Sequence, residues 1–238
     1  MSTEQKEISA GSPSKHSGIP HIIQALLILS IGSLITVGLI WLINGEFFID
    51  LEERLLILFR HSSDLANPLG STAIEESIRD LTSLGSTLVT TLVTIYVVVS
   101  LYLYQKPRYA MFLAVAVLLG VGYVFLIKLG FDRPRPDVVP HFMHSLSPSF
   151  PSAHSAMSAM VYLLVADVLA RGFPNKSLKV FIFSIAILII VSVGISRVYL
   201  GVHWPTDVLG GWVIGITWVL TCWMVEKVLI DKQILKQA

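Results

Sequence analysis

The sequence carries little charge and almost no cysteine. Only 14% of its 238 residues are Asp, Glu, Lys or Arg, whereas 54% are hydrophobic. A water-soluble domain usually has nearer a quarter charged residues, so these values argue against a soluble enzyme and exclude a disordered chain. The 17 basic and 16 acidic side chains leave a net charge of +1, so no nucleic-acid partner is expected. The single cysteine, Cys222, excludes an intrachain disulfide and zinc-finger spacing.

Long apolar runs take the place of the missing charge. A helix needs about 20 mostly apolar residues to cross the hydrocarbon core of a bilayer. The runs are continuous rather than alternating, which favours helices over the strands of a barrel. We therefore expect an all-α, polytopic membrane protein with six transmembrane helices in one bundle, the fourth being barely long enough. Their approximate bounds are 19–43, 84–104, 109–127, 155–169, 180–195 and 208–229.

Polar segments flank this membrane domain, which we place at residues 19–230. Residues 1–18 are rich in Ser, Gly and Lys and predict a disordered cytoplasmic tail, and residues 231–238 predict a short C-terminal cytoplasmic tail. Six helices place both termini on one side of the membrane. That side would hold ten of the 17 basic residues, namely Lys6, Lys15, Lys106, Arg108, Arg171, Lys176, Lys179, Lys227, Lys232 and Lys236. The positive-inside rule therefore makes both termini cytoplasmic and turns the connection between the third and fourth helices outward.

The first outward connection, residues 44–82, contains a helix signal. Asp50 followed by Glu53 resembles a helix N-cap with its capping partner, ahead of the apolar run 55–59. We expect a short amphipathic helix lying on the outer membrane surface. An ordinary helix packed on the bundle is the alternative.

Polar and ionisable residues gather in three segments, at 128–136, 148–155 and 196–207. Ionisable side chains are costly at membrane depth, so such residues are candidates for a functional site. Odd-numbered helices would run outward and even-numbered helices inward. The three segments should therefore converge on the outward face.

The residue types in these segments suit a bound anion. Lys128, Arg135 and Arg197 are cations without a matching acidic cluster nearby in the sequence. Guanidinium groups bind phosphate oxygens in bidentate fashion. Residues 152–154 would begin the fourth helix, where free backbone N–H groups attract a phosphate.

Two histidines and one aspartate suit phosphoryl transfer. His203 and Asp207 are four residues apart, so a helix that begins near residue 204 would bring them together. Asp207 would then hold the imidazole and fix its tautomer, which leaves the other nitrogen of His203 as a nucleophile. His154 supplies a second imidazole for general-acid work. The histidines lack metal-site spacing and the cations would repel a metal ion, so we predict no metal and no cofactor.

In combination, the three segments resemble the signature of the type 2 phosphatidic acid phosphatase (PAP2) superfamily of membrane lipid phosphatases. The first family motif, Lys, six residues, then Arg-Pro, is similar to KLGFDRPRP at 128–136. The second, Pro-Ser-Gly-His, is similar to PSAH at 151–154, and the third, Ser-Arg, five residues, His, three residues, Asp, to SRVYLGVHWPTD at 196–207. Ala153 stands where the family usually has Gly. It fits if this position is the first turn of a helix.

The resemblance implies a metal-independent phosphatase or diphosphatase that acts on lipid phosphates. It implies that His203 attacks phosphorus to form a phosphohistidine, that Asp207 orients His203, and that His154 protonates the leaving oxygen. The phosphate-binding residues that it implies are Lys128, Arg135, Ser152, Ala153 and Arg197.

The predicted topology restricts the candidate substrates and the membrane in which the protein would act. An outward-facing site would act on outer-leaflet lipids of a bacterial plasma membrane, with a lipid phosphate and the bilayer as partners. Undecaprenyl diphosphate is the first choice, and phosphatidylglycerol phosphate, phosphatidic acid and a lipid A phosphate are the alternatives. A lipid phosphotransferase would use the same residues. An anion transporter is a rival of another class, disfavoured because the charges lie on one face; oligomeric state is not predicted.

Overall fold

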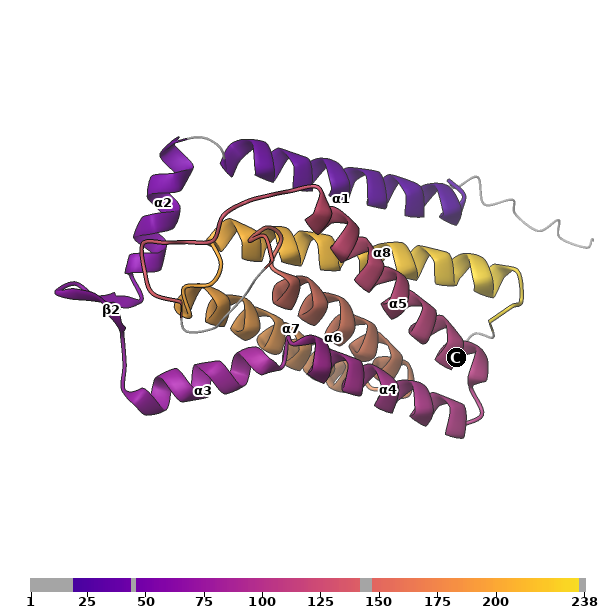
Figure 1. Ribbon diagram of the computed structural model, residues 1–238. Coiled ribbons are helices and arrows are strands. Elements are labelled where there is room, and N and C mark those ends of the chain that lie inside the picture. The colour runs from indigo at the N-terminus through magenta and orange to yellow at the C-terminus, as the bar shows by residue number, and fades with distance from the viewer. Residues whose placement is uncertain (1–18, 44–45, 142–146, 236–238) are drawn as a thin grey trace, which may run out of the picture.

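The computed structural model describes residues 19–43, 46–141 and 147–235, and it is predominantly helical (Figure 1). The helices are α1 (His21–Ile43), α2 (Glu46–Ile57), α3 (Thr72–Ser83), α4 (Thr87–Leu103), α5 (Pro107–Leu129), α6 (Ala153–Arg171), α7 (Lys176–Tyr199) and α8 (Pro205–Asp231). A short antiparallel hairpin of β1 (Arg60–His61) and β2 (Asp64–Pro68) lies between α2 and α3. The tail predicted at 1–18 and the last three residues of the tail predicted at 231–238 lie outside the described residues.

Local chemistry sets the ends of the long helices. α5 and α8 each begin with a proline, whose missing N–H and fixed φ suit the first helical position. The Asn175 side chain accepts from the N–H groups of Ser177 and Leu178 at the start of α7. Such caps satisfy N–H groups that have no partner within the helix.

Five helices among the described residues are long and apolar enough to span a membrane, namely α1, α5, α6, α7 and α8. α4 has 17 residues and passes the same test only together with α3, from which it is bent by 49°. On α5, Leu118 and Leu126 are exposed by 71% and 69%, which suits a lipid-facing surface. The chain is therefore an all-α integral membrane protein, and the count of six spans stays a prediction.

Small residues let α6 pack closely against α8 at the centre of the bundle. A Cβ atom on Gly211 would lie 2.6 Å from the Ser152 carbonyl oxygen, and one on Gly215 would lie 2.7 Å from the Ala156 carbonyl oxygen. These glycines are four residues apart and face the same neighbour, as in the small-residue interfaces of membrane helices. This contact fixes the start of α6 against the start of α8.

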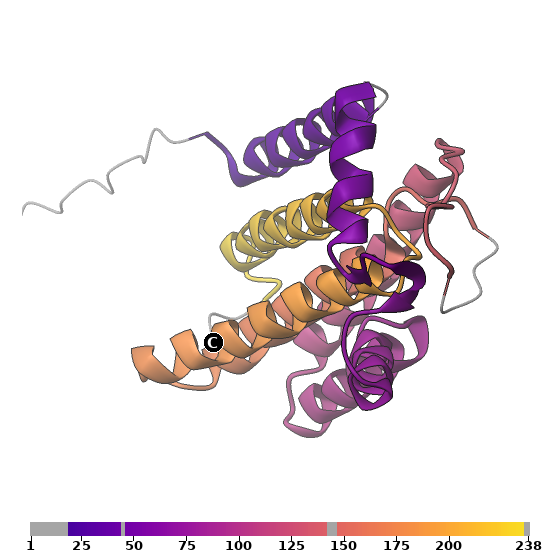
Figure 2. The ribbon, with the colours of Figure 1, turned by 90° about the vertical axis from the view of Figure 1, so that its left-hand side faces the viewer.

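The two ends of the described chain lie at the same end of the bundle. His21 Nε2 at the start of α1 is 3.7 Å from Asp231 Oδ2 at the end of α8. The hairpin and α2 lie at the opposite end, as Figures 1 and 2 show. The shared location of the termini agrees with an even number of spans.

The first connection differs from its prediction. Its helix α2 begins at Glu46, so Asp50 lies in the second turn and is not the N-cap. Glu52 and Leu56 are buried at 2% and 0% exposure, because α2 packs on the bundle as in the alternative considered above. The hairpin and the second amphipathic helix, α3, were not predicted.

Candidate active site

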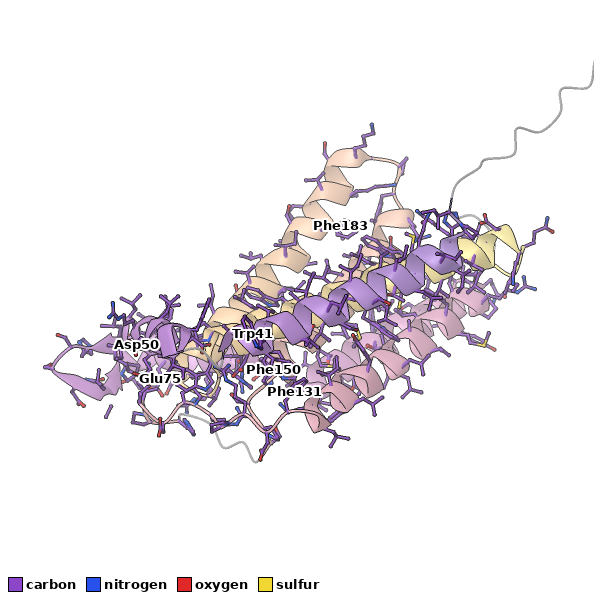
Figure 3. The ribbon with its side chains drawn as sticks, turned by 90° about the horizontal axis from the view of Figure 1, so that it is seen from above. Trp41, Asp50, Glu75, Phe131, Phe150 and Phe183 are labelled. Atoms are coloured by element: carbon purple, nitrogen blue, oxygen red, sulfur yellow. The ribbon has the colours of Figure 1, made fainter. Side chains whose placement is uncertain are left out.

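The three predicted segments meet at the end of the bundle that lies opposite the described termini (Figure 1). The first follows α5, the second leads into α6, and the third forms the turn between α7 and α8. The Ser152 N–H donates to the Asp207 carbonyl oxygen over 3.0 Å, joining the second segment to the third. The rings of Phe131 and Phe150 pack edge to face with centroids 5.7 Å apart, joining the first to the second (Figure 3). The convergence predicted from the sequence is therefore present in the structure.

His203 and Asp207 are paired at the start of α8. Asp207 is the third residue of the helix, and its Oδ2 accepts from the Trp204 N–H over 2.9 Å, which satisfies a donor that the helix leaves free. The same Oδ2 lies 3.3 Å from His203 Nδ1 and also accepts from the Ser149 hydroxyl. Asp207 is 0% and His203 2% exposed. The carboxylate contact assigns the ring proton to Nδ1 and leaves Nε2 as the nitrogen with a lone pair.

The other ring nitrogen of His203 faces a cation. His203 Nε2 lies 3.3 Å from Arg135 Nη1. Burial lowers the pKa of His203 from 6.5 to about 4; the hydrogen bond and charge of Asp207 oppose this shift, and the charges of Arg197 and Arg135 add to it. His203 is therefore neutral near pH 7, the state in which Nε2 can act as a nucleophile.

Arg135 is anchored by main-chain oxygens. Its Nε donates to the Ser147 carbonyl over 3.1 Å, and its Nη1 donates to the Val202 carbonyl over 2.5 Å. Burial lowers the pKa of Arg135 below its usual value while the charge of Asp207 opposes the shift, and an arginine stays charged at neutral pH.

Lys128 and Arg197 are buried beside the same turn. The Lys128 ammonium donates to the carbonyls of Pro148 and Pro151 over 2.6 and 3.1 Å. Arg197 Nη1 donates to the Thr82 hydroxyl over 3.2 Å. The oxygens in these contacts carry no formal charge, so these contacts position the two cations without neutralising them.

The start of α6 has the form that the sequence predicts. Ser152 is the N-cap, and its hydroxyl oxygen accepts from the Ser155 N–H over 3.4 Å. Ala153 is the first helical residue, so alanine fits without the strain of a positive φ. His154 follows and is partly exposed, and it lies within the electrostatic reach of the cations Arg197, Arg135 and Lys128.

Four polar residues of this region were not among the predicted site residues. They are Glu52, Thr82, Arg133 and Ser149. Arg133 follows Lys128 by five residues, but its surroundings could not be read from the sequence. Its guanidinium pairs with both Asp207 and Glu52. The other three contact the site through space, and no short-range spacing marks them.

A cavity of about 470 Å³ opens beside Lys128 and is also lined by Phe125, Leu129 and Ser147. A larger cavity of about 640 Å³ lies between α5 and α8 towards the termini, and none of the predicted site residues lines it. We take the smaller cavity as the one connected with the site, because Lys128 contacts the two carbonyls that lead into α6.

The fold and the site together define a class. The protein is a helical membrane protein whose one end combines a His–Asp pair, a second histidine and three cations. In the part of the chain that the structure describes, no group of three or more His, Cys, Asp or Glu side chains could hold a metal ion.

Comparison with known proteins agrees with this class. A family model described as the PAP2 superfamily matches residues 109–230. Phosphatidylglycerophosphatase B of Bacillus subtilis (strain 168) is 48% identical over 92 residues, which are 38% of this chain and 45% of that protein. Undecaprenyl-diphosphatase BcrC of the same organism is 30% identical over 117 residues, 47% of this chain and 55% of that protein. The chain thus spans about half the length of these curated relatives.

One solved structure extends the likeness to nearly the whole chain. The crystal structure of a transmembrane PAP2 type phosphatidylglycerolphosphate phosphatase from Bacillus subtilis superposes with a TM-score of 0.71 and 26% identity, covering 92% of this chain and 99% of that one. The family match covers half of the chain and contains all three segments. The chain therefore belongs to the PAP2 superfamily.

Proposed function

We propose that the protein is a metal-independent phosphatase of lipid phosphates or diphosphates that works through a phosphohistidine. The observation that carries the proposal is the buried His203–Asp207 pair, whose unprotonated Nε2 lies 3.3 Å from Arg135 Nη1. A neutral imidazole next to an anion-binding cation can approach a phosphoryl group that the cation holds.

In the first step, His203 Nε2 attacks phosphorus and the bond from phosphorus to the bridging oxygen breaks. Asp207 accepts a hydrogen bond from the Nδ1–H and stabilises the positive charge that develops on the ring. His154 gives its proton to the leaving oxygen, so the lipid departs as an alcohol or a monophosphate. The phosphoryl oxygens are bound by Lys128, Arg135, Arg197, the Ser152 hydroxyl and the Ala153 N–H.

In the second step, water attacks the phosphorus of the phosphohistidine. The neutral His154 accepts a proton from this water, and the bond between phosphorus and Nε2 breaks to release inorganic phosphate. His154 ends protonated and His203 neutral, which restores the starting state.

The substrate proposal follows from the relatives and the membrane position. The sequence-based first choice, undecaprenyl diphosphate, is the substrate in the names of BcrC and of two further relatives. Phosphatidylglycerol phosphate is the second candidate, favoured by the 48% identical relative and by the solved structure. We place the reaction at the extracytoplasmic face of a bacterial inner membrane, with both termini in the cytoplasm, because six spans would put ten of the 17 Lys and Arg residues of the sequence on the side of the termini.

The first prediction is that His203→Ala abolishes turnover. Detergent-purified protein would be assayed for phosphate release in excess EDTA, with undecaprenyl diphosphate, phosphatidylglycerol phosphate, phosphatidic acid and a lipid A phosphate. We expect His203→Ala to lose about a thousandfold or more of kcat, because it lacks the nucleophile. His61→Ala, a change of an exposed histidine in the hairpin, should retain full activity.

Other results would replace this proposal. Release that stops in EDTA would contradict the metal-independent reaction, and full activity of His203→Ala would contradict the phosphohistidine. If the folded protein released no phosphate but phosphorylated an added acceptor lipid, the phosphotransferase alternative would stand instead. Phosphate uptake into liposomes without hydrolysis would favour a transporter.

A further inference from the structure

Glu52 is a buried carboxylate that the first connection brings to the site from outside the three motif segments. It lies on α2 and is 2% exposed. Its Oε1 accepts from the Thr206 N–H over 3.0 Å and also from the Thr206 hydroxyl. Because α8 begins at Pro205, this N–H belongs to the first turn, where the helix has no acceptor of its own. Glu52 therefore caps α8 from another helix.

Arg133 joins Glu52 to Asp207. Its Nη2 lies 2.5 Å from Glu52 Oε2, and its Nη1 lies 2.6 Å from Asp207 Oδ1. Nη1 also donates to the Thr206 hydroxyl oxygen over 2.9 Å, and the guanidinium lies over the Trp204 ring with its Cζ 5.3 Å from the centroid. The planar guanidinium of Arg133 thus binds two buried carboxylates, Glu52 through Nη2 and Asp207 through Nη1.

In this arrangement the two carboxylate oxygens of Asp207 have different hydrogen-bond partners. Oδ1 accepts from Arg133, whereas Oδ2 accepts from Ser149 and Trp204 and lies beside His203 Nδ1. The carboxylate is therefore held on both sides, and its plane sets the direction of the imidazole. If Glu52 lost its charge, Arg133 Nη2 would lose its charged acceptor, and the guanidinium could then bind Asp207 through both Nη1 and Nη2. Oδ2 would then be drawn away from His203.

We propose that Glu52 is a positioning residue for the proposed phosphatase reaction: through Arg133 it fixes Asp207 and keeps His203 Nε2 directed at the phosphoryl group. This inference rests on the proposed function, and Glu52 itself touches no reacting atom. It also gives the first connection a role, because α2 completes the support of the nucleophile.

The second prediction concerns Glu52→Gln. Glutamine keeps the volume and one carbonyl acceptor for Thr206 but presents an amide donor to the Arg133 fork. We expect kcat to fall by about 10- to 100-fold, the cost of a small misplacement of a reacting group, with KM within about twofold of its original value. Asp50→Asn is the matched control, because Asp50 lies on the same helix and is exposed (Figure 3). Its kcat should not change.

A second readout does not depend on turnover. The ¹⁵N spectrum of histidine-labelled protein reports which ring nitrogen carries the proton, and the His203→Ala spectrum assigns the His203 signals. In the wild-type protein these signals should show the Nδ1–H tautomer. In Glu52→Gln they should show a mixture of tautomers, because Asp207 no longer fixes the ring.

The outcomes separate this inference from the proposed function. A Glu52→Gln protein with wild-type kcat and unchanged ¹⁵N signals would overturn the positioning role, even if its melting temperature were lower. If wild-type protein released no phosphate from any lipid, the proposed function would fail. The ¹⁵N spectra alone would then decide whether Glu52 orients the imidazole.

Discussion

His203 is a buried histidine whose native environment disfavours its charged form. Removal from water lowers its pKa from 6.5 to about 4, although Asp207 lies beside it. In the unfolded chain the same imidazole titrates near its ordinary value. Above pH 6.5 it is neutral in both states, so it imposes no pH dependence on stability. Between pH 6.5 and 4 the imidazole of His203 is protonated in the unfolded chain but neutral in the native state. The free energy of unfolding therefore falls as the pH falls.

The third prediction follows from this difference. Acidification from pH 7 to pH 4 should cost the wild-type protein about 3 kcal/mol through His203 alone, at 1.36 kcal/mol for each pKa unit. The measurement is the midpoint of thermal unfolding in detergent over this range. His203→Gln has no titrating ring and should lose less stability over the same range. Parallel curves for the two proteins would contradict the assigned pKa.

The site residues that the sequence predicted make contacts that are local in the chain, whereas those that it missed make contacts between distant residues. His203 and Asp207 were predicted as a pair because they are four residues apart at the expected start of a helix, so their contact is local in the sequence. Ser152 and Ala153 were predicted because residues 152–154 were expected to begin a helix, whose free backbone N–H groups attract a phosphate. Glu52 lies 154 residues from Thr206 along the chain, and Thr82 lies 115 residues from Arg197. Contacts of that separation depend on tertiary packing, which no local pattern encodes.

At the scale of elements, the apolar runs predicted the long helices well and the first connection poorly. α1, α5, α6, α7 and α8 each contain a long apolar run whose length is set by the bilayer. α2 begins at Glu46, four residues before Asp50. The spacing of Asp50 and Glu53 did not mark the start of the helix, because two acidic residues three positions apart also occur inside helices. The hairpin and α3 are short, and their stability comes from packing on the bundle rather than from local preference.

The fourth prediction tests the α6–α8 interface. A methyl group on Gly211 would lie 2.6 Å from the Ser152 carbonyl oxygen, and backbone atoms cannot move aside as a flexible side chain can. We expect Gly211→Ala to separate the two helices, to destabilise the protein by about 1–3 kcal/mol and to lower kcat, because the Ser152 N–H would lose its contact with the Asp207 carbonyl.

Gly122 on α5 provides the matched control. A Cβ atom there meets nothing within 4 Å, so Gly122→Ala should leave kcat unchanged and raise stability by up to about 1 kcal/mol. Melting temperature and kcat of both variants in detergent are the measurements. Equal behaviour of Gly211→Ala and Gly122→Ala would show that α6 and α8 do not need their close approach.

At the scale of the whole molecule, the bundle has two chemically different ends. The site end carries the buried pairs of Glu52, Arg133 and Asp207 and the cations that would meet a phosphate. The opposite end holds both ends of the described chain, and there a second, partly exposed network joins Arg171 to Asp167 and Glu226, each over 2.6 Å. This second network sets one guanidinium against two carboxylates, whereas the cations at the site, Lys128, Arg133, Arg135 and Arg197, outnumber Glu52 and Asp207. Of the two ends, the site end is therefore the better suited to recruit an anion.

The fifth prediction concerns which end faces the cytoplasm. Cys222 would first be replaced by Ala, and then Ser63→Cys at the exposed turn of the hairpin and Ser177→Cys at the exposed start of α7 would be introduced singly. These positions lie at opposite ends of the bundle, because α7 runs from the end with the termini towards the site. A membrane-impermeant maleimide should label Ser63→Cys in intact bacterial cells and label Ser177→Cys only after the membrane is opened, because the side that six spans would give ten of the 17 Lys and Arg residues is expected to stay inside. The reverse pattern would place the site in the cytoplasm and would remove outer-leaflet lipids as substrates, while leaving the chemistry of His203 untouched.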